Sequence, residues 1–195
     1  MARPLKKELL LWTRTLHIYL TMFGLVLLFF FSLTGFALNH DRWFSLDEPT
    51  MRDRSAALPA DLARSGERLA LVEYLRKNEA ARGEVTSVDE DDNERRVQFS
   101  SPGRKVEFTV ERDSGQTAVH EETRNALAFL TDLHTGKTAG DLWRRFIDAT
   151  AIFLFLASLS GAILWISLPK RRKLGVAALV GGTVLTASLI VWLMV

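Results

Sequence analysis

The chain has 195 residues, of which 48% are hydrophobic, and it carries 25 Lys and Arg against 23 Asp and Glu. It contains no cysteine. Disulfides, thiolate metal sites, iron-sulfur clusters and covalently attached haem are therefore excluded, and any cofactor must be held by other side chains. The pI of 9.1 is basic, but the excess of positive charge lies beside the apolar runs, so nothing indicates nucleic-acid binding.

Three apolar runs take up about a third of the chain. The first, Ile18 to Leu38, has 21 residues without a charge, enough at 1.5 Å per residue to cross a hydrocarbon layer of roughly 30 Å. Phe146 to Leu168 and Leu174 to Val195 have the same character. The first run is longer than the apolar core of a signal peptide, and no small-residue cleavage site follows it. We therefore expect an uncleaved anchor and three transmembrane helices.

The charges indicate how these helices are oriented. From Asp41 to Lys137 there are 15 Lys and Arg against 20 Asp and Glu, whereas the rest of the chain has 10 against 3. The positive-inside rule places the N-terminus in the cytoplasm and the acidic segment outside. The expected organisation is a cytoplasmic N-terminus with the first transmembrane helix (1–40), a periplasmic domain (41–140), the second transmembrane helix (141–169), a basic cytoplasmic loop (170–173) and the third transmembrane helix (174–195).

The segment between the first two apolar runs has the pattern of a small α+β domain. After a polar connector, 41–59, a helix is expected over 65–78, with Leu69, Val72 and Leu75 at the spacing of a buried face. Alternating apolar residues and Gly-containing turns predict strands over 84–90, 95–100, 105–111 and 116–120. A second helix is expected over 121–135, where Gly136 ends it.

Histidine is the residue type that could carry chemistry in this chain. His17 begins the first apolar run and His40 follows its end, 23 residues later, which is roughly 35 Å along a helix, so they cannot share a site. His134 lies on the apolar face of the second domain helix, near the second run. An imidazole at membrane depth is costly unless it has a partner, which indicates a function. His120, on a predicted strand, is expected to be solvated or structural.

Two similar clusters of small residues lie within the apolar runs. Ser158 to Gly161, S-L-S-G, repeats Ser32 to Gly35, S-L-T-G. Two antiparallel helices could approach closely where such clusters meet. On the first run, small residues share a helix face with His17, leaving flat room that a neighbouring helix or a porphyrin could use.

The motifs together resemble a known family. They are R-x-L-H at Arg14 to His17, S-L-T-G, L-H-T-G at Leu133 to Gly136, and S-L-S-G-x-x-L-W at Ser158 to Trp165, with a PepSY-like repeat, V-E-F-T-V-E-R-D-S-G-Q-T, between them. Nearly the whole chain resembles the PepSY-associated transmembrane helix family. Its members are bacterial inner-membrane proteins, and the better understood are b-type haem proteins that reduce periplasmic ferric siderophores. Larger relatives have four spans and can hold two haems, whereas this chain has three.

The resemblance implies haem b, one or two per chain, bound by histidine. His40 and His134 are the expected axial pair near the outer surface, because neutral imidazoles on both faces suit an electron-transfer iron. His17 is expected to be a haem ligand completed by a second protomer or another subunit, or the single ligand of a second haem, or alternatively to be hydrogen-bonded across the helix packing. Arg14, one turn earlier, could pair with a haem propionate or extend to lipid headgroups.

Two functions follow from these expectations. The first is an inner-membrane electron carrier, a ferric-chelate reductase or an electron-transfer subunit, which takes electrons from a quinol or another inner donor and passes them to a periplasmic ferric chelate or flavoprotein. The second is a haem-free, membrane-tethered PepSY module that binds or regulates a partner, or an accessory subunit. Either one could work as a homodimer or in a larger membrane complex.

Overall fold

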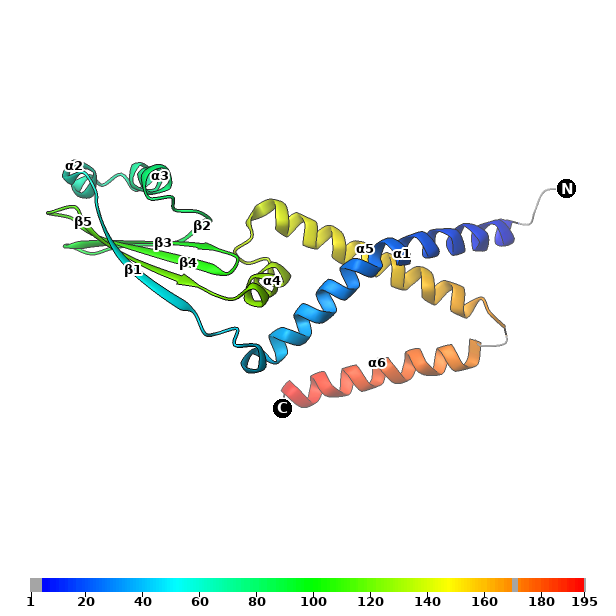
Figure 1. Ribbon diagram of the computed structural model, residues 1–195. Coiled ribbons are helices and arrows are strands. Elements are labelled where there is room, and N and C mark those ends of the chain that lie inside the picture. Colours follow the sequence, from blue (N-terminus) through cyan, green and yellow to red (C-terminus); the bar gives the residue numbers. More distant parts are fainter. Residues whose placement is uncertain (1–4, 170–171, 195) are drawn as a thin grey trace. The chain divides into compact units, whose positions relative to one another are not determined.

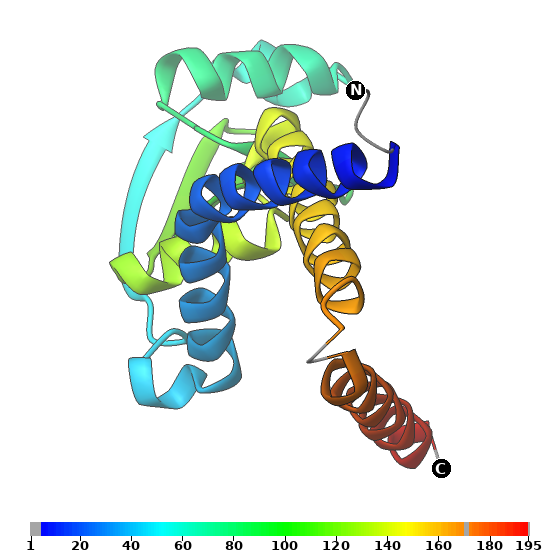
Figure 2. The same cartoon turned by 90° about the vertical axis from the view of Figure 1, so that its right-hand side faces the viewer.

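The computed structural model describes residues 5–169 and 172–194. It contains three long helices and a five-stranded sheet with shorter helices (Figures 1 and 2). The chain divides into two compact units. One holds the chain up to Leu28 together with the chain from Ala149 onward, and the other is Phe29–Asp148, so the sheet unit includes the last turns of the first long helix and the first turns of the second.

The three long helices are α1 (Leu5–Asn39), α5 (Gly140–Ile166) and α6 (Arg172–Met194). Each is long and apolar enough to cross a membrane, with a mean hydropathy of 2.1 over its most apolar window. The expectation of three transmembrane helices is thus confirmed by length and composition. Of the predicted basic loop 170–173, residues 170 and 171 lie outside the described part of the chain.

The sheet is antiparallel throughout, with the strand order β1-β5-β4-β3-β2. Its strands are β1 (Thr50–Ala57), β2 (Glu84–Glu90), β3 (Glu94–Ser101), β4 (Arg104–Glu111) and β5 (Gln116–Thr123). Val97, Phe108 and Val119 form one row across the three central strands. Since side chains alternate along a strand, this row and its neighbours two residues away present one apolar face.

The core lies between that apolar face and two helices, α2 (Ala60–Arg64) and α3 (Arg68–Asn78). Leu71 and Leu75 of α3 are almost fully buried against Phe99 and Phe108, whose rings meet edge to face with centroids 5.7 Å apart. The predicted α+β unit is therefore confirmed: helices cover one face of a small antiparallel sheet.

The buried face of α3 differs from the predicted one. The sequence pattern placed Leu69 in the core, but its side chain is 74% exposed. The expected helix over 65–78 is α3, which begins only at Arg68 and ends at Asn78 as expected, and a separate short helix, α2, ends at Arg64. Leu71 and Leu75, one turn apart, then face the sheet, while Leu69 lies at the start of α3 and points outward.

One strand was not predicted, and one boundary between a strand and a helix differs from expectation. β1 was not predicted, because its sequence, T-M-R-D-R-S-A-A, lacks apolar alternation, and seven of its eight residues are exposed. Such charged, exposed strands are common at sheet edges, where charge discourages pairing with other chains. β5 continues to Thr123, so the helix predicted over 121–135 is the shorter α4 (Ala126–Thr135).

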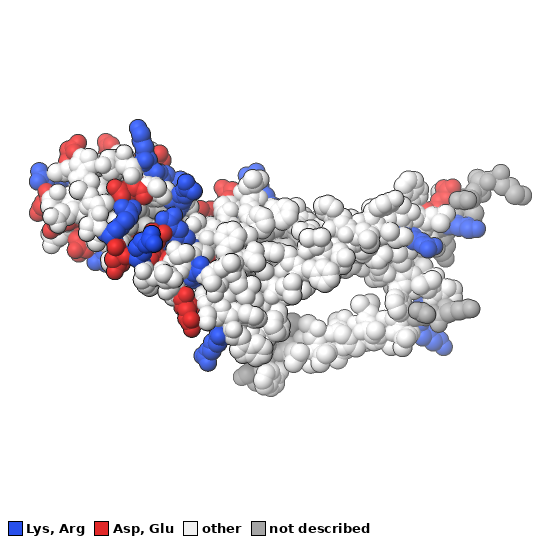
Figure 3. Space-filling model, viewed as in Figure 1, with Lys and Arg blue, Asp and Glu red and all other residues white. Residues whose placement is uncertain are grey.

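Charged side chains gather over the sheet domain and leave the long helices largely bare of charge (Figure 3). In the domain, Arg104 donates a hydrogen bond to Glu121 on the adjacent strand, 2.6 Å away. This bond, together with the positive charges of Arg104, Arg52 and Arg54, holds the pKa of the Glu121 carboxyl below its usual value. Glu121 thus stays ionised and paired at neutral pH.

The core assignment predicts a clear contrast between two substitutions. Phe108→Ala should lower the free energy of unfolding by about 3–5 kcal/mol, because it removes a fully buried ring from the centre of the sheet. Leu69→Ala, the matched control, should change it by less than about 0.5 kcal/mol, because the side chain is exposed. Denaturant unfolding of the full-length protein in detergent measures both, and a Leu69→Ala loss as large as that of Phe108→Ala would contradict this core.

Candidate functional site

The position of His134 is fixed by both ends of its helix. Asn125 caps the start of α4, where its side chain accepts a hydrogen bond from the Ala128 N–H at 2.8 Å and donates to the carbonyl of Phe44, which follows α1. At the other end, Gly136 adopts a left-handed conformation, φ 68°. This conformation favours glycine, and a Cβ there would also lie 2.6 Å from the δ-methyl group of Ile147 of α5, which would have to move. The glycine of L-H-T-G thus both ends the helix and allows α5 to approach.

His134 contacts the S-L-T-G cluster at the end of α1. Its Nδ1 lies 2.7 Å from the Thr34 hydroxyl, and its Cε1 lies 3.4 Å from where a Cβ on Gly35 would stand. The ring of Phe31 meets the imidazole edge to face, with centroids 5.1 Å apart. Thr34 is almost completely buried, so this is a hydrogen bond formed inside a packed site.

The hydrogen bonds of Thr34 define the tautomer of His134. A hydroxyl carries one proton, and that of Thr34 is donated to the Phe30 carbonyl one turn earlier, at 2.6 Å. With its proton on that carbonyl, the Thr34 oxygen is an acceptor toward His134, and this arrangement favours the tautomer with the ring N–H on Nδ1. The lone pair of the neutral imidazole is consequently on Nε2.

His17 forms the same kind of contact with α5. Its Nδ1 lies 2.9 Å from the Ser160 hydroxyl and 3.2 Å from the Ala157 carbonyl. A carbonyl can only accept, so Nδ1 carries the proton. Ser160 also donates to the Ala157 carbonyl at 2.8 Å, as Thr34 does to Phe30. The Nε2 of His17 therefore also has the lone pair.

A groove of about 350 Å³ runs beside His17, lined mainly by apolar residues of α1 and α5. Gly24 and Gly161 form parts of its wall, and a Cβ on either would collide with a neighbouring side chain, Phe153 or His17. The small residues predicted on this face of α1 therefore provide close approach of the helices and space beside the imidazole at the same time.

The structure thus contains one arrangement twice. In each case a histidine of an L-H motif donates Nδ1–H to the hydroxyl in the third position of an S-L-[S/T]-G motif and lies beside the following glycine. The sequence pattern singled out all four motifs but suggested that the two small-residue clusters meet each other. The hydrogen-bonding partner of each cluster is instead a histidine, a pairing that one sequence cannot reveal.

His40 lies in a different setting. Its ring stacks on Phe36 and lies against Trp43, with centroid distances of 4.3 and 4.2 Å, and its Nδ1 is 3.0 Å from the Phe36 carbonyl. His40 follows Asn39, the last residue of α1, and its backbone is not helical (φ −130°, ψ 45°). Among the described residues, no hydrogen bond or ring contact joins His40 to His134, and their expected axial pairing stays a prediction.

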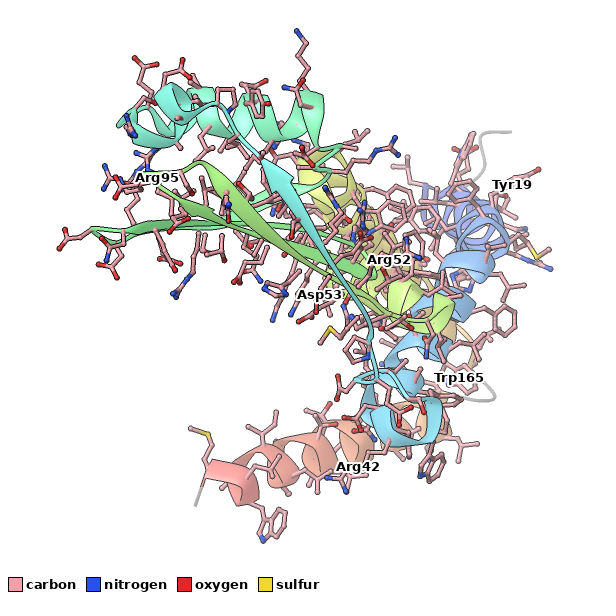
Figure 4. All side chains as sticks on the ribbon, turned by 60° about the vertical axis from the view of Figure 1, so that its left-hand side comes forward. Tyr19, Arg42, Arg52, Asp53, Arg95 and Trp165 are labelled. Atoms are coloured by element: carbon pink, nitrogen blue, oxygen red, sulfur yellow. The ribbon has the colours of Figure 1, made fainter. Side chains whose placement is uncertain are left out.

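The remaining candidates lie at the surface. Arg14 is exposed and makes no ion pair within the described residues. His120 of β5 lies on the sheet face that the helices leave uncovered, and its Nδ1 is 2.7 Å from a carboxylate oxygen of Asp53 on β1 (Figure 4 labels Asp53). This pair lines an open polar depression of about 370 Å³. Among the described residues, no group of three His, Asp or Glu is placed to hold a metal ion.

The fold and these contacts define a membrane protein with three apolar helices and a small extramembrane α+β domain. The chain belongs to the PepSY_TM-like family, whose sequence model matches residues 11–195. The match confirms the expected family and covers the three helices and the sheet domain. No curated protein and no solved structure matches the chain.

The two glycines beside the histidines predict different responses to an added methyl group. An alanine Cβ at position 161 would stand 2.9 Å from Cε1 of His17, so in Gly161→Ala the ring must move. In Gly35→Ala the corresponding distance to His134 is 3.4 Å, an ordinary contact. The 13Cε1 resonance of His17 should shift clearly in the first variant of the full-length protein, and that of His134 should barely shift in the second. Equal shifts would contradict the packing described.

Proposed function

We propose that this protein is a b-type haem protein of the bacterial inner membrane that takes part in electron transfer to an acceptor outside the membrane. The observation that carries the proposal is the repeated histidine arrangement. Two imidazoles, one on an apolar helix and one against the end of an apolar helix, each have Nδ1 bound to a hydroxyl, so that Nε2 is the ring nitrogen able to bind a metal. Metal-ligating histidines usually donate their second N–H in this way.

The residues present suit a haem iron. The chain has no cysteine, so neutral imidazole is the natural ligand for low-spin iron here. A glycine beside each ring keeps the backbone flat next to the ligand, and the groove at His17 is lined mostly by apolar side chains, as a porphyrin face requires. Bound haem would supply a one-electron couple that no side chain of the protein provides.

His17 and His134 belong to separate sites in this proposal. Seventeen residues of one helix separate His17 from Thr34, the partner of His134, and these span about 26 Å at 1.5 Å per residue. Each histidine would therefore hold its own haem. The second ligand would come from another chain, such as a second copy of this protein or a larger complex, or from His40 in the case of His134.

His40 and Arg14 would take part in haem binding only under further conditions. For His40 to join His134 at one iron, its ring would have to leave the stack on Phe36 and Trp43 and turn around α1. Arg14 is one turn before His17, exposed and without an ion pair among the described residues, so its guanidinium is available for a haem propionate or a lipid phosphate.

The proposed orientation of the protein in the membrane follows from charge. The two basic flanks of the membrane helices would face the cytoplasm and the acidic sheet domain the periplasm, according to the positive-inside rule. A quinol or another inner donor would then supply electrons near His17, and a ferric chelate or flavoprotein would receive them near His134 and the sheet domain. Membrane lipid surrounds the exposed apolar faces of the three helices.

A haem-free PepSY module tethered to the membrane is the alternative. One observation favours it: both histidines already have hydrogen-bond partners within the protein, which is what a purely structural role in helix packing would require. In that case the sheet domain would carry the function by binding or regulating a partner.

Spectra of substituted proteins separate the two functions. The full-length protein, expressed with sufficient haem, should show a reduced-minus-oxidised spectrum of low-spin haem b. His17→Ala and His134→Ala should each remove one of the haems, because each loses a bond to the iron, and His120→Ala should match the parent. Loss of the same haem in His40→Ala and His134→Ala would identify them as one axial pair.

Two results would contradict the proposal. A parent protein without haem would exclude electron transfer and leave the PepSY module. Full haem content, by pyridine haemochrome, in both His17→Ala and His134→Ala would show that neither residue is a ligand.

The proposed orientation has its own test. A cysteine introduced at Ser114, in the β4–β5 turn, should react with a membrane-impermeant maleimide in intact spheroplasts, because it would face the periplasm. A cysteine at Lys173, near the start of α6, should react only after the membrane is opened. The native chain has no cysteine, so the parent protein is an unlabelled control. The reverse labelling pattern would overturn the orientation.

A further inference from the structure

The two histidine contacts are alike but not equivalent. Nδ1 of His17 has two acceptors, the Ser160 hydroxyl and the Ala157 carbonyl. For Nδ1 of His134, the described structure contains one, the Thr34 hydroxyl. If the Ser160 side chain were removed, the Ala157 carbonyl would still accept the proton of His17. Among the described residues, His134 has no second acceptor that could replace the Thr34 hydroxyl.

We propose that Thr34 is the positioning residue that fixes the tautomer and ring orientation of His134, and that Ser160 does this only in part for His17. The tautomer is a property of the chain itself, whereas the consequence for haem rests on the function proposed above. If the Thr34 hydroxyl is removed, either ring nitrogen of His134 can carry the proton. Only the form protonated at Nδ1 offers a lone pair at Nε2.

Thr34 is well suited to this role because its own side chain is held in place. A β-branched residue in a helix has few χ1 rotamers, and the hydrogen bond to the Phe30 carbonyl selects one of them. Its oxygen is thus presented to His134 in a single position. The side chain is 3% exposed, so water does not compete effectively for that oxygen.

The bond also changes what Nε2 can do. Hydrogen bonding from Nδ1–H raises the electron density of the imidazole and makes Nε2 a stronger donor to a metal. Loss of such an outer contact typically weakens metal binding by about 10-fold to 100-fold. We therefore expect a weakening in this range for haem at His134 without the hydroxyl, and a smaller one for haem at His17 without Ser160.

The test uses three variants of the full-length protein in detergent. Thr34→Val removes the hydroxyl and keeps the branched shape, Thr34→Ser keeps the hydroxyl and removes the methyl group, and Ser160→Ala removes the other hydroxyl. The haem-free protein is labelled with 15N-histidine, and long-range 15N–1H correlation spectra report which ring nitrogen carries the proton. Thermal unfolding of each variant checks that the fold is kept.

We expect His134 to be a single Nδ1–H tautomer in the parent and in Thr34→Ser, and a mixture in Thr34→Val. His17 should stay in the Nδ1–H form in Ser160→Ala because Ala157 still accepts its proton. An unchanged His134 tautomer in Thr34→Val would overturn the proposal, and so would a mixture in Thr34→Ser, because the methyl group would then be responsible.

Haem titration of the same variants tests the positioning role of Thr34 separately from the proposed haem function. Weaker binding in Thr34→Val, with recovery in Thr34→Ser, supports both. A parent protein that binds no haem, together with the expected tautomers, would reject the haem function while the positioning role of Thr34 stands. Equal haem affinity in parent and Thr34→Val, despite mixed tautomers, would reject the proposed consequence for haem.

Discussion

The hydrogen bond from a histidine Nδ1–H to a helix hydroxyl is the interaction on which the site depends. An imidazole among apolar helices is stable only if its polar atoms are paired, and a hydroxyl that already donates to its own helix can only accept. Thr34 and Ser160 meet this requirement through the carbonyls of Phe30 and Ala157. In each ring, the position of the imidazole proton therefore decides which nitrogen can bind a metal.

The sheet domain contributes to this interaction by positioning α4. Asn125 ties α4 to the chain that follows α1, and the Trp143 indole donates to the Leu133 carbonyl at 2.7 Å, next to His134. Arg144 of α5 pairs with Glu84 of β2 at 2.9 Å. The end of α1, α4, the start of α5 and the sheet thus belong to one compact unit. The position of the His134 ring therefore depends on the packing of the sheet domain.

Hydropathy and alternation predicted the three apolar helices, four strands and the sides of those strands that face the core. Burial of apolar surface dominates the formation of these elements. β1 escaped detection because an exposed edge strand has no apolar face. The sequence also marked His17 and His134 as unusual residues at membrane level. Their partners could not be predicted, since side-chain pairing between residues 100 or more positions apart depends on packing. The pairing of His40 with His134 was inferred from the expected topology, which brings the outer ends of the first two apolar runs to one membrane surface, and it stays a prediction.

The proposed function requires Nε2 of His17 and His134 to bind haem iron. Pulsed electron paramagnetic resonance on the oxidised, haem-loaded full-length protein tests it most directly, using histidine labelled with 15N at Nε2 alone. The account predicts strong hyperfine coupling of the iron spin to 15N from a histidine ligand, and loss of that coupling when His17 and His134 are both replaced by alanine. Strong axial coupling only to unlabelled nitrogen, or coupling that persists in the double variant, would contradict it.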